Sequence, residues 1–199
     1  LPRTIAYCND MLWDSVTNVP DFKISGNLIV RGDFIMDEAM SFGFIDPTND
    51  LYQLMKETPC VYFASNTQAL INPKRKKMFV DVRFIGEGNP EYIIQSKFDV
   101  KDLILSSGLL IAQRKMIIAD RLIIDDSPVQ KGLIADSSVI IIDSSTTLTN
   151  QQMIEGYASF DVMSDSASVN CNGTRIVLRG NNAVFNGGRN SYDIIDFKN

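Results

Sequence analysis

The chain has 199 residues, of which 45% are apolar and 22% are charged, and this balance excludes general disorder and allows a buried core. Its formal net charge of −5 opposes binding to phosphate backbones, so nucleic acid is not an expected partner. The chain contains no histidine, which excludes Ser-His-Asp catalysis, Cys-His catalysis and histidine-ligated zinc.

The first half predicts a mixture of strands and short helices. Two short helices are expected, over 9–16 and, after a cap at Asn49 or Asp50, over 51–57. The strand-like runs are rich in β-branched and aromatic residues and cover 24–30, 33–36, 61–63 and 78–85. Residues 1–99 are therefore expected to form a mixed strand and short-helix region.

Four consecutive cations, Lys74 to Lys77, follow Asn72-Pro73 and precede a strand-like run. A cationic run of this length in a globular chain is usually a solvated turn. We interpret it in that way from the sequence.

Residues 100–199 show a tighter pattern, in which short apolar runs recur at steps of about six to eight residues. Several runs end in Asp, as in Met116–Asp120 and Val139–Asp143, which is typical of short strands closed by bends. A helix of at most two turns is expected over 149–155. The spacing predicts a mostly-β protein with a parallel β-solenoid in this half, either as a separate region or as part of one continuous domain. A β-sandwich or jelly roll is the alternative, but its strands commonly recur at wider steps, so the observed spacing favours the solenoid.

Apolar triplets such as Ile140-Ile141-Ile142 must place some side chains outward, because neighbouring residues of a strand point to opposite faces. These outward side chains need a cover. The cover is either the N-terminal half of the chain, folded back on the solenoid, or another subunit. Another subunit would make a homo- or hetero-oligomer through exposed apolar strands, which is the partner we expect.

Carboxylates at strand ends are the candidates for a metal site. In a stacked fold, Asp120, Asp126 and Asp143 would come close together, where they could bind calcium or serve as acid and base on a glycan. The alternative is ordinary turn chemistry, in which Asp caps local backbone amides. No cofactor other than calcium is expected.

The tripeptide Arg31-Gly32-Asp33 matches a short integrin-recognition sequence and lies between two apolar runs, where an exposed turn is expected. In receptor binding, Asp33 would complete a metal site while Arg31 pairs with an acidic pocket. A plain turn, with Gly32 supplying the bend, is the alternative interpretation.

Three widely spaced cysteines, Cys8, Cys60 and Cys171, fit neither a disulfide framework nor a zinc motif. The sequence leaves open whether two of them form one disulfide bridge or all three are free thiols.

No apolar stretch is long enough for a transmembrane helix. The chain begins without an initiator Met, so a processed or truncated form is expected.

Residues 24–34 and 132–141 carry a rung-like pattern of apolar, polar, apolar, Gly and polar residues. This pattern resembles the rungs of bactofilins and of repeat regions in bacterial surface, pilus-associated and phage fibre proteins. The resemblance implies a non-enzymatic structural or adhesive role in an extracellular, cell-surface or virion assembly. A carbohydrate-binding or carbohydrate-active solenoid is the alternative.

Overall fold

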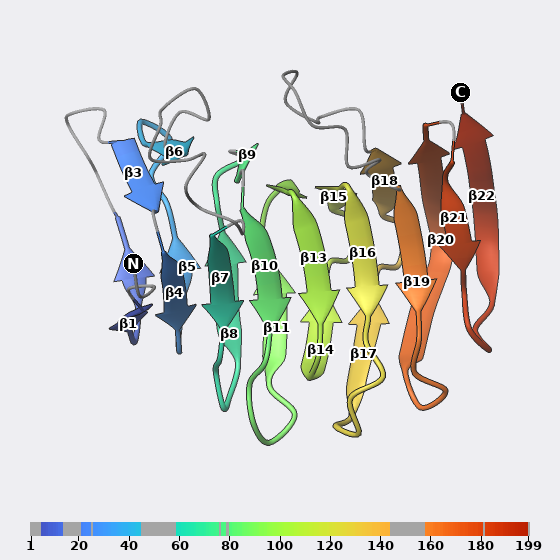
Figure 1. Ribbon diagram of the computed structural model, residues 1–199, viewed down its shortest axis with the longest axis horizontal. Coiled ribbons are helices and arrows are strands. Elements are labelled where there is room, and N and C mark those ends of the chain that lie inside the picture. The colour runs from blue at the N-terminus through green and yellow to red at the C-terminus, as the bar shows by residue number, and fades with distance from the viewer. Residues whose placement is uncertain are drawn as a thin grey trace.

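The computed structural model describes residues 5–13, 21–24, 26–44, 59–75, 77–78, 80–143, 158–180 and 182–198. These residues form strands joined by turns and bends, and the strands pair in parallel as a β-solenoid (Figure 1). Three short strands make up a typical turn of the solenoid, which we call a rung. The rungs are stacked in chain order, with the N-terminal rung at one end and the C-terminal rung at the other.

The first face of the solenoid, face A, contains one strand from each rung. Its strands follow the order β1 (Ile5–Cys8), β4 (Asn27–Val30), β7 (Cys60–Phe63), β10 (Asp81–Phe84), β13 (Asp102–Leu105), β16 (Arg121–Ile124), β19 (Ser159–Val162) and β21 (Val184–Asn186).

The second and third faces join through one long strand, β20 (Ser168–Arg179). Face B contains β2 (Met11–Leu12), β5 (Phe34–Ile35), β8 (Ala69–Asn72), β11 (Glu91–Ile94), β14 (Gly108–Ile111), β17 (Lys131–Ile134) and the first part of β20. Face C contains β9 (Lys77–Met78), β12 (Phe98–Val100), β15 (Met116–Ala119), β18 (Val139–Asp143), the second part of β20, and β22 (Tyr192–Lys198). Strands β3 (Asp21–Ile24) and β6 (Ser41–Phe44) pair with each other.

Strand β20 bends at the corner between faces B and C. Gly173 has a φ of 65°, a left-handed conformation that glycine adopts without steric cost. Because of this bend, the first part of β20 pairs with β17 and its second part pairs with β18.

Alternation along each strand separates core from surface. In β10, for example, Val82 and Phe84 are buried while Arg83 is exposed, as a strand with one apolar face requires. Several hydrogen bonds between neighbouring rungs join residues 19 to 23 apart in the chain. The strands pair in register, so each inward side chain lies on its counterpart in the next rung.

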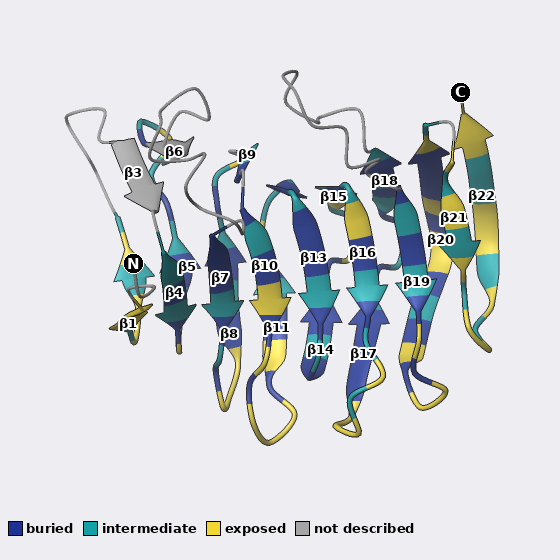
Figure 2. Cartoon of the chain, in the orientation of Figure 1, coloured by how far each residue is buried: buried dark blue, intermediate teal, exposed yellow. Residues whose placement is uncertain are grey.

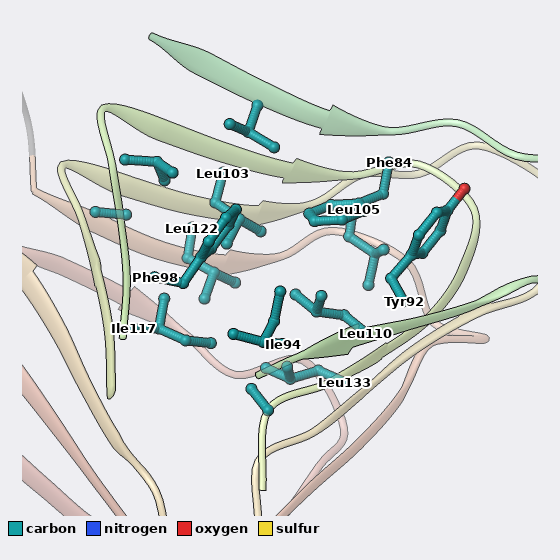
Figure 3. Packing of buried hydrophobic residues seen from close by; sticks show 14 of the residues in the cluster. Phe84, Tyr92, Ile94, Phe98, Leu103, Leu105, Leu110, Ile117, Leu122 and Leu133 are labelled. Carbon is teal, nitrogen blue, oxygen red and sulfur yellow. The ribbon is translucent and has the colours of Figure 1, made fainter. Parts of the chain in front are cut away.

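Aromatic side chains stack along the inside of the solenoid. The rings of Phe63 and Phe84 lie 5.3 Å apart and nearly parallel, and Tyr92 packs against Phe84 at 4.8 Å. Figure 3 shows side chains of all three faces meeting in this core, including Phe98 from face C. The interior is therefore filled by side chains along the described rungs.

Hydroxyl groups bond to the backbone at the sharp bends between faces A and B. The buried Tyr92 Oη accepts a hydrogen bond from Gly86 N at 2.9 Å and donates one to Phe63 O at 3.0 Å. Ser107 Oγ donates to Gly86 O at 2.6 Å. These bonds matter because a buried backbone group without a partner would destabilise the fold.

The parallel solenoid expected over 100–199 is confirmed, and the same stacks continue through the first half of the chain, since β4, β7 and β10 pair in series with β13. The helix expected over 9–16 is corrected, because residues 11–12 form β2 and hydrogen-bond to β5. The helices expected over 51–57 and 149–155 lie outside the described residues.

The hydroxyl of Tyr92 gives a direct test of the bend chemistry. Tyr92→Phe keeps the ring but leaves Gly86 N without this partner, so we expect a loss of about 1–2 kcal/mol in the free energy of unfolding, measured by urea denaturation. Tyr7→Phe is the control, because Tyr7 is 61% exposed and its change should leave stability intact. Equal stability of the Tyr92 variant and the parent would contradict this role.

Candidate functional site

The Arg31-Gly32-Asp33 tripeptide lies in the bend between β4 and β5. Asp33 Oδ1 accepts a hydrogen bond from Leu70 N at 2.8 Å, and Asp33 N donates one to Asp10 Oδ1, also at 2.8 Å. The carboxylates of Asp10 and Asp33 thus each accept a hydrogen bond from a backbone amide of the next rung. Asp33 therefore already serves contacts between rungs, and receptor recognition by the tripeptide stays a prediction.

Two of the three carboxylates expected to form a metal site lie near each other. The pairing of β15 with β18 places Asp120 and Asp143 at neighbouring positions of one corner, whereas Asp126 is exposed after β16 at a different corner. Asp143 Oδ2 lies 3.4 Å from Arg179 Nη1. Within the described ranges, no three carboxylates or thiols gather as a ligand set. Calcium binding at these positions stays a prediction.

A different charged cluster lies on face A, where three successive rungs place Asp81, Asp102 and Arg121 in one column. Asp102 is buried, and Arg121 Nε lies 3.1 Å from each of its carboxylate oxygens. Asp81 Oδ1 is buried without a hydrogen-bond partner among the described residues. Burial, reinforced by the Asp102 charge, raises the pKa of Asp81 to about 6, although Lys101, Arg121 and Arg83 act in the opposite direction.

A buried lysine holds the loop after β16. The side chain of Lys131 has no exposed area, and its Nζ donates to Ser127 O and lies 3.7 Å from Asp125 Oδ1. Burial by itself would raise the pKa of Asp125, but hydrogen bonds from Ser106 and Ser127, together with the Lys131 charge, lower it below its ordinary value. Each of these polar groups thus has a partner within the loop or the neighbouring rung.

The outward surface of face B carries a continuous row of aliphatic side chains, which we call the aliphatic row: Leu70, Ile93, Ile111 and Ile134. Strand pairing places these four residues on consecutive rungs, and each is half-buried. On face C, Ile118 and Ile141 are aligned in the same way and half-buried, whereas Val177, the next residue in register, is buried. The apolar triplets of the sequence therefore do place side chains on the outside of the solenoid.

The three cysteines do not form a disulfide. Cys60 and Cys171 are buried, Cys8 is half-buried, and all three are free thiols. Burial raises the pKa of Cys171 to about 12, with further effects from Asp136 and Asp193. A thiol with so high a pKa is unreactive at neutral pH.

Comparisons with protein-family models, curated proteins and solved structures found no match to this chain. In the described part of the chain, no helix has the length and apolar character needed to cross a membrane.

Sequence reasoning missed the column formed by Asp81, Asp102 and Arg121. The first two residues each begin a strand of face A, and they are separated by one rung. Aligning the sequence with itself at a repeat of about 20 residues, the length of one rung, could have brought these two positions together. The spacing between one strand and the next does not reveal them. The rung length was hidden because the bends differ in length.

The raised pKa of Asp81 predicts a pH-dependent stability. The folded state binds the Asp81 proton more tightly than the unfolded chain, so this group contributes stability at low pH that is lost as the pH rises from about 4 through about 6. Asp81→Asn removes the ionisation, and we expect a gain of about 1–2 kcal/mol at pH 7 and a smaller difference at pH 4, measured by chemical denaturation.

The exposed Asp126 provides a matched control, because Asp126→Asn makes the same chemical change on the surface and should alter stability little. A loss of stability in Asp81→Asn at pH 7 would show that the nearby cations hold Asp81 ionised in the fold.

Proposed function

We propose that this chain is a non-enzymatic structural component of an extracellular assembly, such as a pilus, fibre, virion or filament, in which copies associate side by side. The aliphatic row on face B is the observation that supports this function most. Its members Ile93, Ile111 and Ile134 follow one another on paired strands and remain partly accessible to solvent.

A second copy is the partner that best matches this row. Adjacent strands of a sheet lie about 4.8 Å apart, so the outward side chains of every copy repeat with the same spacing along the solenoid axis. Two such faces can interdigitate without a change in the backbone. Removal of apolar surface from water contributes about 25 cal/mol per Å², which favours such a contact.

The first and last described rungs add to the exposed apolar surface. Ile5 and Tyr7 in β1 are 50% and 61% exposed, and Ile194 and Phe197 in β22 are 47% and 62% exposed. Figure 2 shows this exposure at both ends of the stack. Large apolar groups in contact with water favour further association.

The carbohydrate-active alternative has one observation in its favour, the neighbouring carboxylates of Asp81 and Asp102. A raised pKa on one of two adjacent carboxyls is typical of an acid and base pair. However, Asp102 is only 3% exposed and is bound by Arg121, so a glycan has little access to it. A structural role accounts for both features.

Association through face B can be measured by sedimentation velocity over a range of protein concentrations. We expect the parent chain to self-associate and Ile111→Lys to weaken that association at least tenfold, because the substitution places a charge in the middle of the aliphatic row. Gln68→Lys is the control, since it adds the same charge at an exposed edge of face B. A parent chain that stays monomeric at all concentrations would contradict the proposal.

Incubation with neutral and acidic glycans tests the enzymatic alternative. We expect no release of new reducing ends. Cleavage that disappears in Asp81→Asn while the fold is retained would replace the structural function with an enzymatic one.

A further inference from the structure

A column of positive charge lies at the corner between faces B and C. It consists of five residues, which we call the corner cations: Lys74, Arg75, Lys97, Arg114 and Lys115. They occupy the bends between β8 and β9, between β11 and β12, and between β14 and β15. Because these strands pair in series on both faces, the bends lie one above another on three consecutive rungs.

Most of the corner cations form no ion pair with another residue that the structure describes. Among the described residues, Lys97 binds Asp99 at 2.7 Å, whereas the side chains of Lys74, Arg75, Arg114 and Lys115 form no ion pair. Arg75 and Arg114 are exposed. Stacking like charges on adjacent strands is unfavourable unless an anion neutralises them. Four of the five cations in the column thus form no ion pair within the described residues, although Glu38 lines the same recess as Lys74 and Arg75, on a chain of net charge −5.

The backbone of the first bend is held in a strained conformation. Lys74 and Arg75 have φ values of 50° and 64°, so two successive residues with side chains lie in the left-handed region. Their amides donate to Asn72 Oδ1 at 3.1 Å and to Ser96 Oγ at 3.3 Å, which fixes the turn. Arg114 and Ser137 have the same left-handed conformation at this corner on later rungs, so the turn is a repeated feature of the corner that fixes where these side chains project.

A shallow recess and a row of amides accompany the corner cations. The recess has a volume of about 520 Å³ and is lined by Glu38, Asn72, Lys74, Arg75 and Ser96. Beside it, Asn72 Nδ2 donates to Gln95 Oε1 at 3.3 Å, and on a further rung Gln113 Nε2 donates to Asp136 Oδ2 at 3.4 Å. Gln95 and Gln113 are exposed, and amide side chains can both donate to and accept from hydroxyl groups.

We propose that the corner cations bind an acidic polysaccharide. Its sulfate or carboxylate groups pair with Lys74, Arg75, Arg114 and Lys115, while its hydroxyl groups bond to the neighbouring amides. The polymer lies along the solenoid axis, because the cations are separated by the rung spacing of about 4.8 Å. This site uses residues distinct from the aliphatic row, so it stands whether or not copies of the chain associate.

Binding of a heparin-type octasaccharide, followed by fluorescence polarisation at low and physiological salt, tests the site. We expect the double variants Lys74→Gln/Arg75→Gln and Arg114→Gln/Lys115→Gln each to weaken binding at least tenfold, and the affinity of the parent to fall as salt rises. The control Arg189→Gln/Lys198→Gln removes the same charge from the last rung and should change binding less than twofold. Equal loss in all three variants, or no binding by the parent, would overturn the proposal.

The amide row distinguishes a polysaccharide from other polyanions. We expect Gln95→Ala/Gln113→Ala to weaken octasaccharide binding at least threefold while leaving the binding of inorganic polyphosphate unchanged. A single-stranded oligonucleotide or a vesicle of anionic lipid that binds more tightly than the octasaccharide would assign the corner cations to another partner and overturn the inference.

Discussion

The parallel hydrogen bonding between rungs is the constraint on which the rest of this structure depends. Because each strand pairs in register with its counterpart one rung away, every side chain lies directly on another, and a residue type that suits one rung must suit its neighbours. Inside the solenoid this requirement selects apolar residues such as Phe63 and Phe84, whose rings stack. On the outside the same rule turns single residues into rows, as with Ile111 and Ile134.

The bends between strands must supply hydrogen-bond partners for the backbone groups that become buried when three short strands surround one core. A chain that turns sharply every few residues leaves backbone groups inside, and these groups require hydrogen-bond partners. Tyr92 and Ser107 supply hydroxyl groups at one corner, and at another Ser138 Oγ donates to Ala112 O at 2.5 Å. Side-chain chemistry at the corners therefore permits the strand ladder to continue from rung to rung.

Much of the fold could be predicted from sequence because strand alternation is local. The runs ending in Asp, such as Met116–Asp120, do form short strands closed by bends, and their spacing indicated a solenoid. In the first half, Met11 and Leu12 occupy so short a strand that its pattern resembled a helical turn. The charged columns could not be predicted, because they depend on the register between rungs. That register depends on bend lengths, which vary, so Asp81 and Asp102 become neighbours only when the chain is folded.

Stacking also governs where charge can lie. Several cations and carboxylates neutralise each other between rungs, as Arg121 does with Asp102 and Arg175 with Asp196. An exposed pair such as Arg175 and Asp196 adds little stability, but it relieves the repulsion that a column of like charges would create. Lys74 and Arg114 depart from this arrangement, since no carboxylate of the described residues pairs with them. The register that builds the fold therefore also stacks cations that form no ion pair within the described residues, and an anion bound there would relieve their mutual repulsion.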